Sequence, residues 1–483
     1  MPDRYHIHTT VTPGRFHRVG KFGDIDWRED CSRCTNCVKL RCCFEVYKHE
    51  SAHNRDPIGA IETLYECKAC FSCVQGCTKG LLSLSINPEF LEMGNQYWKP
   101  DTILSTWNQA DSGRIPVSGA GYRGAFHGPG FDSIWTDMSE IVRPTRDGIH
   151  GREYISTTVD IGEKPMLLEF SPAGDILGEP PPLLEIQIPA ILDVPAWAMP
   201  QLMLARARAL AAKELRTMAA VFASEAAKLS SDLVPYVVPI CSGNAELPGV
   251  LERDYSMIQL VDSPAIADMA GRVRSSRPRM IASARLPLSP GVTARILELS
   301  RCGIKVFQLS ADLYGRERIP GGQPGRHIRD ALREIHGQLV DGGIRDEITL
   351  VISGGIALAE HLAKSIICGA DLAAIDTALL VALGCRVCER ANPTSTCESG
   401  NSNPTSHGDC PIQIRSLDPD YACRRIVNLV GAWHGQLIEV LGAMGIREVR
   451  RLRGEMGRAI FLEEIMKEAF GDLPRAYVEE EIA

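Results

Sequence analysis

Beyond about residue 165, short apolar runs alternate with amphipathic stretches, which is the pattern of strands followed by helices. The apolar runs are rich in Val, Ile and Leu, as parallel strands that are buried on both faces should be. Seven runs qualify as strands: 184–192, 233–240, 256–261, 280–286, 305–309, 348–352 and 372–375. Helical patterns between them cover 199–229, 264–274, 290–301, 325–341 and 357–368.

This alternation predicts the fold class. Repeated strand–helix units of this number over roughly 220 residues favour a (β/α)8 TIM-like barrel. A doubly wound open sheet is the alternative, because the pattern assigns only seven strands. Residues 415–475 are expected to form helices that pack on the outside of the barrel. The predicted fold is therefore α/β, with a barrel and C-terminal helices from residue 166 onward.

Composition narrows the class of protein. Apolar residues make up 45% of the 483 residues and charged residues 23%, which is ordinary for a globular protein. The chain has no uncharged apolar run of about 18 residues, so no membrane span is expected. A formal net charge of −8 gives no basic surface for nucleic acid. Seventeen cysteines without a secretion signal indicate a reducing compartment, and we expect a cytoplasmic protein.

Two runs of cysteines lie within residues 1–90, and their spacing is that of ferredoxin-type iron–sulfur loops. The first run is Cys31-x-x-Cys34-x-x-Cys37, followed by Cys42 and Cys43, and the second is Cys67-x-x-Cys70-x-x-Cys73-x-x-x-Cys77. In a two-cluster ferredoxin the fourth cysteine of each run ligates the cluster of the other run. This rule groups the first triplet with Cys77 and the second triplet with Cys42 or Cys43. Cys42 is favoured, because Cys42-Cys43-Phe44 corresponds to Cys-Pro-Phe with the proline replaced.

Disulfides and zinc are the alternatives for these cysteines. Crowded cysteines without a secretion signal argue against disulfides, and zinc sites use two separated pairs rather than triplets. The sequence therefore predicts two [4Fe–4S] clusters in a ferredoxin-like domain over residues 1–90. Residues 91–165 are rich in Gly, Pro and Trp and are expected to be an irregular connector to a barrel domain over 166–483. Gly119, Gly121 and Gly124 of this connector lack the βαβ unit that a dinucleotide site needs.

The C-terminal ends of the predicted strands carry the candidate chemistry of the barrel. Barrel enzymes work at this end, and phosphate usually sits on the loops after strands 7 and 8. The run 348–352, the candidate for strand 7 of a barrel, is followed by Ser353, Gly354 and Gly355, and the two glycines let backbone N–H groups approach an anion. After the run 372–375, the candidate for strand 8, comes Thr377, and the next helix ends at the pair Cys385 and Cys388.

Several tracts resemble the flavin domain of glutamate synthase, as found in archaeal-type and glutamate synthase-related proteins with an N-terminal two-cluster ferredoxin domain. The tracts are 143–156, 343–356, 369–385, 410–411, 422–433 and 444–454. The domain order and the C-terminal third match well, whereas 165–330 match loosely. The resemblance implies FMN on the barrel, a [3Fe–4S] cluster after the eighth strand, and reductive transfer of ammonia to 2-oxoglutarate.

The resemblance also implies which cysteines hold the third cluster. Cys385, Cys388 and Cys410 take the positions of its three ligands. A polar insert over 392–408 adds Cys397, and four cysteines would support a [4Fe–4S] cluster instead. A zinc site or a pair of free thiols is the alternative.

For the flavin, the resemblance implies a site at the mouth of the barrel. The cofactor-binding residues would be Arg285, Ser353, Gly354, Gly355 and Thr377. Arg285 stands where relatives have a lysine, and it either stabilises a reduced, anionic flavin or closes the barrel mouth in a salt bridge. Asp376 departs from the pattern, because relatives have a glycine there and a carboxylate repels the phosphate of FMN.

Two functions are compatible with these features. The first is an FMN-dependent, glutamate synthase-like oxidoreductase acting on CH–NH2 donors, which receives electrons from a reductase or a ferredoxin-type donor through the clusters. The second is a flavin-less electron-transfer or scaffold subunit that works with other redox subunits. Asp376 and the absence of the family's Gly-Glu-Gly-Gly substrate loop from residues 219–225 favour the second function.

Overall fold

The computed structural model describes residues 5–15, 23–27, 34, 36–43, 70–86, 90, 93–115, 130–136, 155–164, 168–195, 200–321, 323–387 and 417–471. The chain forms two compact units. The barrel unit comprises Met1–Pro13, Ser105–Cys385 and Pro393–Ala483. The N-terminal unit comprises Gly14–Leu104 and Arg386–Asn392. The domain boundaries drawn from the sequence stay predictions.

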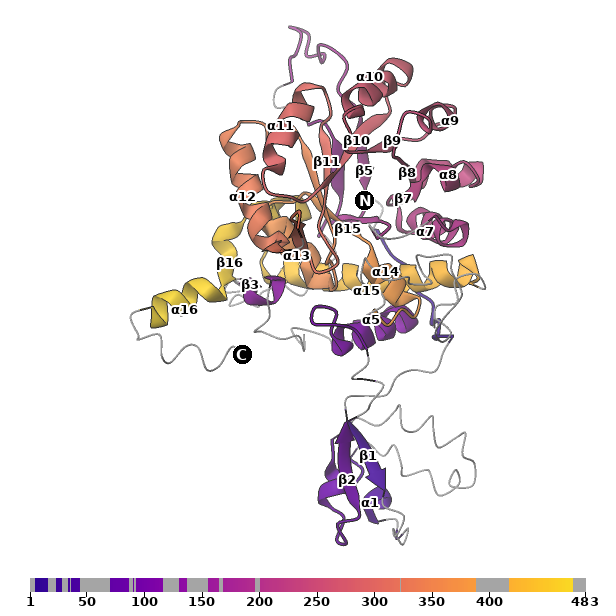
Figure 1. The fold of residues 1–483 in the computed structure, drawn as a ribbon, viewed down its shortest axis with the longest axis vertical. Coiled ribbons are helices and arrows are strands. Elements are labelled where there is room, and N and C mark those ends of the chain that lie inside the picture. The colour runs from indigo at the N-terminus through magenta and orange to yellow at the C-terminus, as the bar shows by residue number, and fades with distance from the viewer. Residues whose placement is uncertain are drawn as a thin grey trace. The chain divides into compact units, whose positions relative to one another are not determined.

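Eight parallel strands close into a barrel in the order β10-β11-β14-β15-β6-β7-β8-β9 (Figure 1). They are β6 (Ala190–Leu192), β7 (Ala219–Phe222), β8 (Val237–Cys241), β9 (Met257–Val261), β10 (Ile281–Pro287), β11 (Val306–Ser310), β14 (Thr349–Ser353) and β15 (Leu372–Ile375). Most of their residues are buried, because helices cover the outside and side chains fill the inside. The predicted TIM-like barrel is confirmed, and the open-sheet alternative is wrong.

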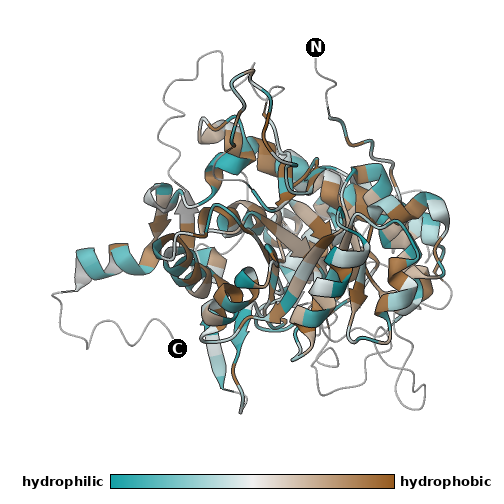
Figure 2. Ribbon diagram, turned by 90° about the horizontal axis from the view of Figure 1, so that it is seen from above, coloured by the Kyte–Doolittle hydropathy of each residue, from teal (hydrophilic) through white to brown (hydrophobic). Residues whose placement is uncertain are grey.

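Helices surround the strands of the barrel. They are α7 (Leu202–Leu215), α8 (Ala223–Ala226), α9 (Leu247–Leu251), α10 (Ile266–Ser276), α11 (Val292–Arg301), α12 (Ile328–Asp341), α13 (Ala359–Ile367) and α14 (Thr377–Ala382). Figure 2 shows hydrophilic segments along the outer helices and hydrophobic segments on the strands they enclose. The predicted C-terminal helices are present as α15 (Pro419–Ala443), which lies against α7 and α13, and α16 (Leu462–Phe470). Among the helices described, none is long and apolar enough to cross a membrane.

The strand that the sequence pattern missed is β7. The prediction placed one helix over 199–229, but α7 ends at Leu215 and Arg216 adopts the left-handed conformation that terminates it. The next segment, Ala219-Ala-Val-Phe222, is the missing eighth strand. Alanine favours helices when its surroundings do not decide, so an alanine-rich strand between two helices reads as a continuation of the first.

Two predicted strands have different bounds in the structure. The run 184–192 divides into β5 (Leu183–Ile186) and β6, and β5 pairs antiparallel with β4 (Val159–Gly162) outside the barrel. The run 233–240 begins with a 3-10 helix over Ser231–Tyr236 before β8 starts. Pro189 and Pro235 mark these breaks in the sequence, since proline cannot donate a hydrogen bond to a strand ladder, but the apolar runs were read through them.

Regular structure also interrupts the segment 91–165, which was predicted to be irregular. It contains α5 (Pro100–Ser112), a 3-10 helix over Gly130–Ser133 and β3 (Ile134–Thr136). β3 pairs antiparallel with β16 (Ala459–Phe461), so this segment is joined to the C-terminal part of the chain. Gly119, Gly121 and Gly124 lie outside the described residues.

The N-terminal unit is built on one pair of strands. β1 (Gly23–Trp27) runs antiparallel to β2 (Leu82–Ile86), with Gly23 opposite Ile86. Two one-turn helices, α1 (Asn36–Lys39) and α3 (Ser72–Gln75), lie between these strands in sequence and contact each other. Both cysteine runs lie between these two strands in the sequence.

Candidate cluster sites and the barrel mouth

The third cysteine of each N-terminal run lies on one of the two short helices. Cys37 of α1 and Cys73 of α3 are buried in one small apolar cluster with Leu82 of β2. Cys34 and Cys70 are exposed, and Cys31 and Cys67 lie outside the described residues. The structure thus brings the two cysteine runs together in one small unit, as a two-cluster ferredoxin requires.

Backbone amides surround the thiol of Cys77. The N–H of Leu81 donates to Cys77 Sγ at 3.4 Å and is the main cause that lowers the pKa of this thiol. The backbone N–H groups of the same turn, at Lys79, Gly80 and Leu82, lower it further. The thiolate is the form that binds iron, and N–H donors to sulfur are a means by which proteins tune iron–sulfur clusters. This environment suits a cluster ligand.

The two candidates for the remaining ligand differ in their surroundings. Cys42 is half-buried, whereas Cys43 is exposed and its thiol donates to the carbonyl of Arg41 at 3.7 Å. Cys42 therefore remains the favoured ligand, as a prediction.

Only one of the cysteines expected at the third cluster lies in the described part of the chain. Cys385 is 6% exposed and follows α14, and its N–H donates to the carbonyl of Leu380 at 3.1 Å. Cys388, Cys397 and Cys410 lie outside the described residues. The third cluster stays a prediction.

A closed network of polar side chains fills the C-terminal end of the barrel. Arg285 of β10 donates to Asp193 Oδ1 at 2.8 Å and to Gln259 Oε1 at 2.9 Å. Gln259 in turn donates to Gln308 Oε1 at 2.7 Å. Gln308 donates to Asp193 Oδ2 at 2.6 Å and to Ser353 Oγ at 3.0 Å. Arg285 thus forms a salt bridge, one of its two expected roles, and its role beside a flavin stays a prediction.

Asp193, Gln259 and Gln308 each use both polar atoms of their side chains on other members of the network. Both carboxylate oxygens of Asp193 accept hydrogen bonds, and its side chain is fully buried. The side chain of Arg285 is 12% exposed and also donates to the carbonyl of Val194. A buried polar network that satisfies all its members is rigid, whereas removing one member leaves the others unpaired.

Asp376 occupies the start of the helix where a phosphate would be expected. Its carboxylate accepts a hydrogen bond from the N–H of Thr377, the first residue of α14. Asp376 is 6% exposed, and burial, with a smaller effect of the Asp193 charge, raises its pKa to about 6. Two unit charges 4 Å apart near a protein surface interact with about 4 kcal/mol, so this carboxylate opposes a phosphate strongly once ionised.

The two glycines after β14 serve a close approach of backbones. A Cβ on Gly354 would lie 2.7 Å from the carbonyl oxygen of Asp312, and one on Gly355 would lie 2.5 Å from Gly315. Both glycines have positive φ, 89° and 68°, and the loop after β11 packs against them. Their conformation is therefore explained by this loop.

These observations test whether FMN fits the mouth. Arg285 is held by Asp193, the N–H of Thr377 is held by Asp376, and the glycine pair is covered by the loop after β11. Ser353 and Thr377 are 1% and 2% exposed, so little of their surface is available to a ligand. The residues present do not fit FMN in the way that the resemblance implies.

Asp193, Gln259 and Gln308 are the site residues that sequence reasoning missed. A signal was present, since Gln259 and Gln308 are polar positions inside otherwise apolar strands and Asp193 directly follows β6. A buried amide in such a run needs a partner, and a partner 49 residues away in sequence could not be named without the fold.

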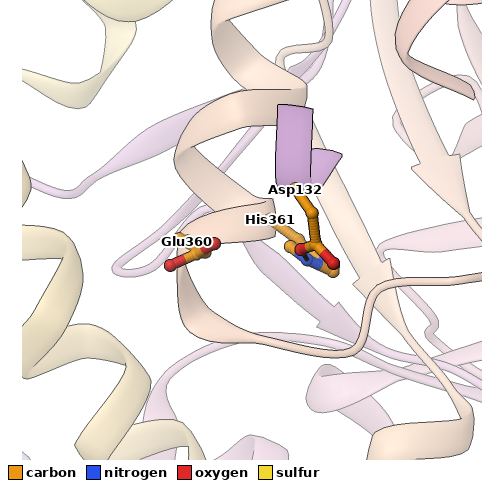
Figure 3. A group of neighbouring side chains, drawn as sticks. All are labelled: Asp132, Glu360 and His361. Carbon is orange, nitrogen blue, oxygen red and sulfur yellow. Dashed lines mark ion pairs between the residues drawn. The ribbon is translucent and has the colours of Figure 1, made fainter. Parts of the chain in front are cut away.

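A second polar cluster, Asp132, Glu360 and His361, has the composition of a metal site (Figure 3). The N–H of Ala357 donates to His361 Nδ1 at 3.1 Å, so a neutral ring carries its proton on Nε2 and has no lone pair there for a metal. Lys364 already donates to Glu360 at 2.9 Å and to the carbonyl of Phe131 at 2.7 Å. Lys364 therefore links Glu360 of α13 to the segment of Phe131, and the tautomer of His361 does not suit a metal ligand.

The fold and the network define a parallel eight-stranded barrel whose mouth is closed by its own side chains. The conserved region in glutamate synthase matches residues 322–447, from β13 (Pro324–His327) through α15. An archaeal-type glutamate synthase (NADPH) from Dehalococcoides mccartyi is 24% identical over 89% of this chain and 93% of its own. The archaeal glutamate synthase (NADPH) of Methanocaldococcus jannaschii is 26% identical over 89% and 92%. These matches confirm the resemblance to archaeal-type glutamate synthases, which are oxidoreductases.

Among solved structures, a lactate oxidase of Pediococcus acidilactici aligns with 73% of this chain and 92% of its own. The TM-score is 0.39 and the identity 13%. The barrel itself is established by the pairing of its strands.

Proposed function

We propose that this chain is an iron–sulfur electron-transfer protein related to the archaeal-type glutamate synthases. Electrons enter from a reductase or a ferredoxin-type donor and pass through two [4Fe–4S] clusters in the N-terminal unit. The observation that carries this proposal is the burial of Cys37 and Cys73 in one small core, beside a thiol whose pKa is lowered by backbone amides.

The ligands follow the two-cluster rule. Cys31, Cys34, Cys37 and Cys77 hold one cluster, and Cys67, Cys70, Cys73 and Cys42 hold the other. Each cluster supplies a reversible one-electron couple. The protein's part would be to place the apolar side chains of Leu82 and Phe71 beside ligands Cys37 and Cys73, and to donate the N–H of Leu81 to the sulfur of Cys77. A third cluster, [3Fe–4S] or [4Fe–4S], is held by Cys385, Cys388 and Cys410, with Cys397 as the further ligand.

The second candidate is FMN-dependent reductive amination, with FMN held at Arg285, Ser353, Gly354, Gly355 and Thr377. The names of the relatives favour it, since they are glutamate synthases (NADPH). The salt bridge of Arg285 and the capping carboxylate of Asp376 oppose it. We therefore place electron transfer, together with other redox subunits, ahead of glutamate formation.

Iron content and EPR of the anaerobically purified chain test the proposal. We expect about eight iron atoms from the two N-terminal clusters, and three or four more if the third cluster forms. Cys77→Ser should alter the signal of one N-terminal cluster, because this thiol is its fourth ligand. Cys302→Ser, outside every run, is the matched control and should leave iron and spectrum unchanged. Zinc in place of iron, or equal effects of the two variants, would overturn the proposal.

A further inference from the structure

We infer that this chain exchanges only single electrons, so that its partners on both sides are one-electron carriers of the ferredoxin class. The inference rests on the proposed electron-transfer function and on the closed mouth of the barrel. It sets the chain apart from relatives whose names include NADPH, a donor of two electrons.

The first step of the argument is that Arg285, the cation expected beside a flavin, is already engaged by other groups. The two terminal nitrogens of Arg285 donate to Asp193, Gln259 and the carbonyl of Val194. Flavins are tuned by cations and hydrogen bonds at their ring. A guanidinium that is paired with a fully buried carboxylate is neutralised and cannot serve an anionic ring without breaking that pair.

The second step is that a hairpin is fastened over three strand ends. β12 (Arg316–Arg318) pairs antiparallel with β13. The N–H of Arg318 donates to the carbonyl of Leu288 after β10 at 2.7 Å, and its guanidinium donates to the carbonyl of Ala311 after β11 at 3.0 Å. The same loop covers Gly355 after β14. Admitting a flavin requires that these contacts break together.

The third step is that the hairpin is held by an ion pair of its own. Arg326 donates to both carboxylate oxygens of Glu317, at 3.0 and 2.8 Å, and Glu317 is 4% exposed. A bidentate pair to a buried carboxylate fixes geometry as well as charge. The hairpin is therefore a fixed part of the mouth.

The chemical consequence concerns electron number. Oxidation of NADPH to NADP+ releases a proton and two electrons as one hydride, whereas a [4Fe–4S] cluster accepts one electron at a time. A flavin links these two kinds of step, because it can accept two electrons together and pass them on one at a time. Without a flavin, an electron enters one cluster from a reduced one-electron carrier and leaves to an oxidised one-electron carrier, and no bond to hydrogen is made or broken.

Anaerobic cluster reduction by the full chain tests the inference. Reduced ferredoxin should bleach the cluster absorbance. NADPH should not, either with the chain as purified or with chain that was incubated with FMN and then separated from unbound flavin by gel filtration. Retained FMN is measured in the same sample, and we expect far less than one FMN per chain. Bleaching by NADPH together with about one FMN per chain would overturn the inference.

Two further outcomes keep the inference separate from the proposed function. If reduced ferredoxin fails to bleach the clusters while no FMN is retained, the proposed function fails and the closed mouth stands. Asp376→Gly should leave FMN retention near zero, because the Arg285 network and the hairpin persist, whereas a gain of about one FMN per chain would overturn the inference. Asp418→Gly is the control for the loss of a helix cap, since Asp418 caps α15 at an exposed position through the N–H groups of Asp420 and Tyr421.

Discussion

Arg285 is the residue whose removal should reveal most about the barrel mouth. Replacing it by alanine leaves the fully buried carboxylate of Asp193 without its cation and removes a donor from Gln259 and from the carbonyl of Val194. Removing one partner of a buried ion pair typically costs about 3–5 kcal/mol. With an unfolding entropy of about 2.1 cal/mol/K per residue, 1 kcal/mol lowers the Tm of a chain of 483 residues by roughly 1 °C, so we expect a loss of about 3–5 °C.

The assay is thermal unfolding followed by circular dichroism, with a surface variant measured in parallel. Arg295→Ala is the matched control, because Arg295 pairs with Asp262 and Glu298 at 2.9 and 2.8 Å but is 28% exposed. An exposed pair contributes about 0–1 kcal/mol, so this variant should lose little. Equal losses in the two variants would refute the buried network. A double variant, Arg285→Met with Asp193→Leu, should recover part of the stability, since no charge is then left unpaired, although Gln259 and Gln308 each lose a partner.

Three further predictions concern charge and metals. Burial raises the pKa of Asp376 to about 6, so between pH 4 and pH 6 the folded state holds a proton that the unfolded state releases. The contribution of Asp376 to the free energy of unfolding therefore falls as the pH rises through this window. The Tm of Asp376→Asn should accordingly rise relative to wild type from pH 4 to pH 7. A gain that does not grow with pH would contradict the burial of this group. Arg345, Lys164 and Arg453 hold the pKa of Asp371 well below its usual range despite burial, so the ionised carboxylate stabilises the fold above pH 4. Asp371→Asn should lower the free energy of unfolding by about 3–5 kcal/mol at pH 7, and by less in acid. An equal loss at pH 3 and pH 7 would contradict this assignment. Added zinc should not change the Tm through the cluster of Asp132, Glu360 and His361. A rise in Tm that His361→Gln abolishes would show that this cluster binds metal.

The barrel was predictable from the sequence because its strands are short apolar runs at regular intervals. The exception was β7, whose Ala219 and Ala220 are buried between neighbouring strands although alanine carries no strand preference. Its place is decided by the closure of the barrel, which no local pattern contains. The cysteine runs were also readable, because cluster ligation requires that spacing.

The closed mouth was only half predictable. Arg285 was identified with two possible roles, and Asp376 was recognised as a departure from the family pattern. Deciding between the roles required the partner of Arg285, which lies 92 residues earlier in the chain and reaches it only through the curvature of the barrel. The hairpin over the strand ends gave no signal of its own, because its polar residues resemble those of any surface loop.

The ratio of flavin to iron in the anaerobically purified chain tests the central claim most directly. Flavin is released by acid and quantified against protein, and iron is measured in the same sample. The account predicts iron of about eight atoms per chain or more, with essentially no FMN, even after incubation with FMN. About one FMN per chain would contradict it and make the barrel mouth a cofactor site.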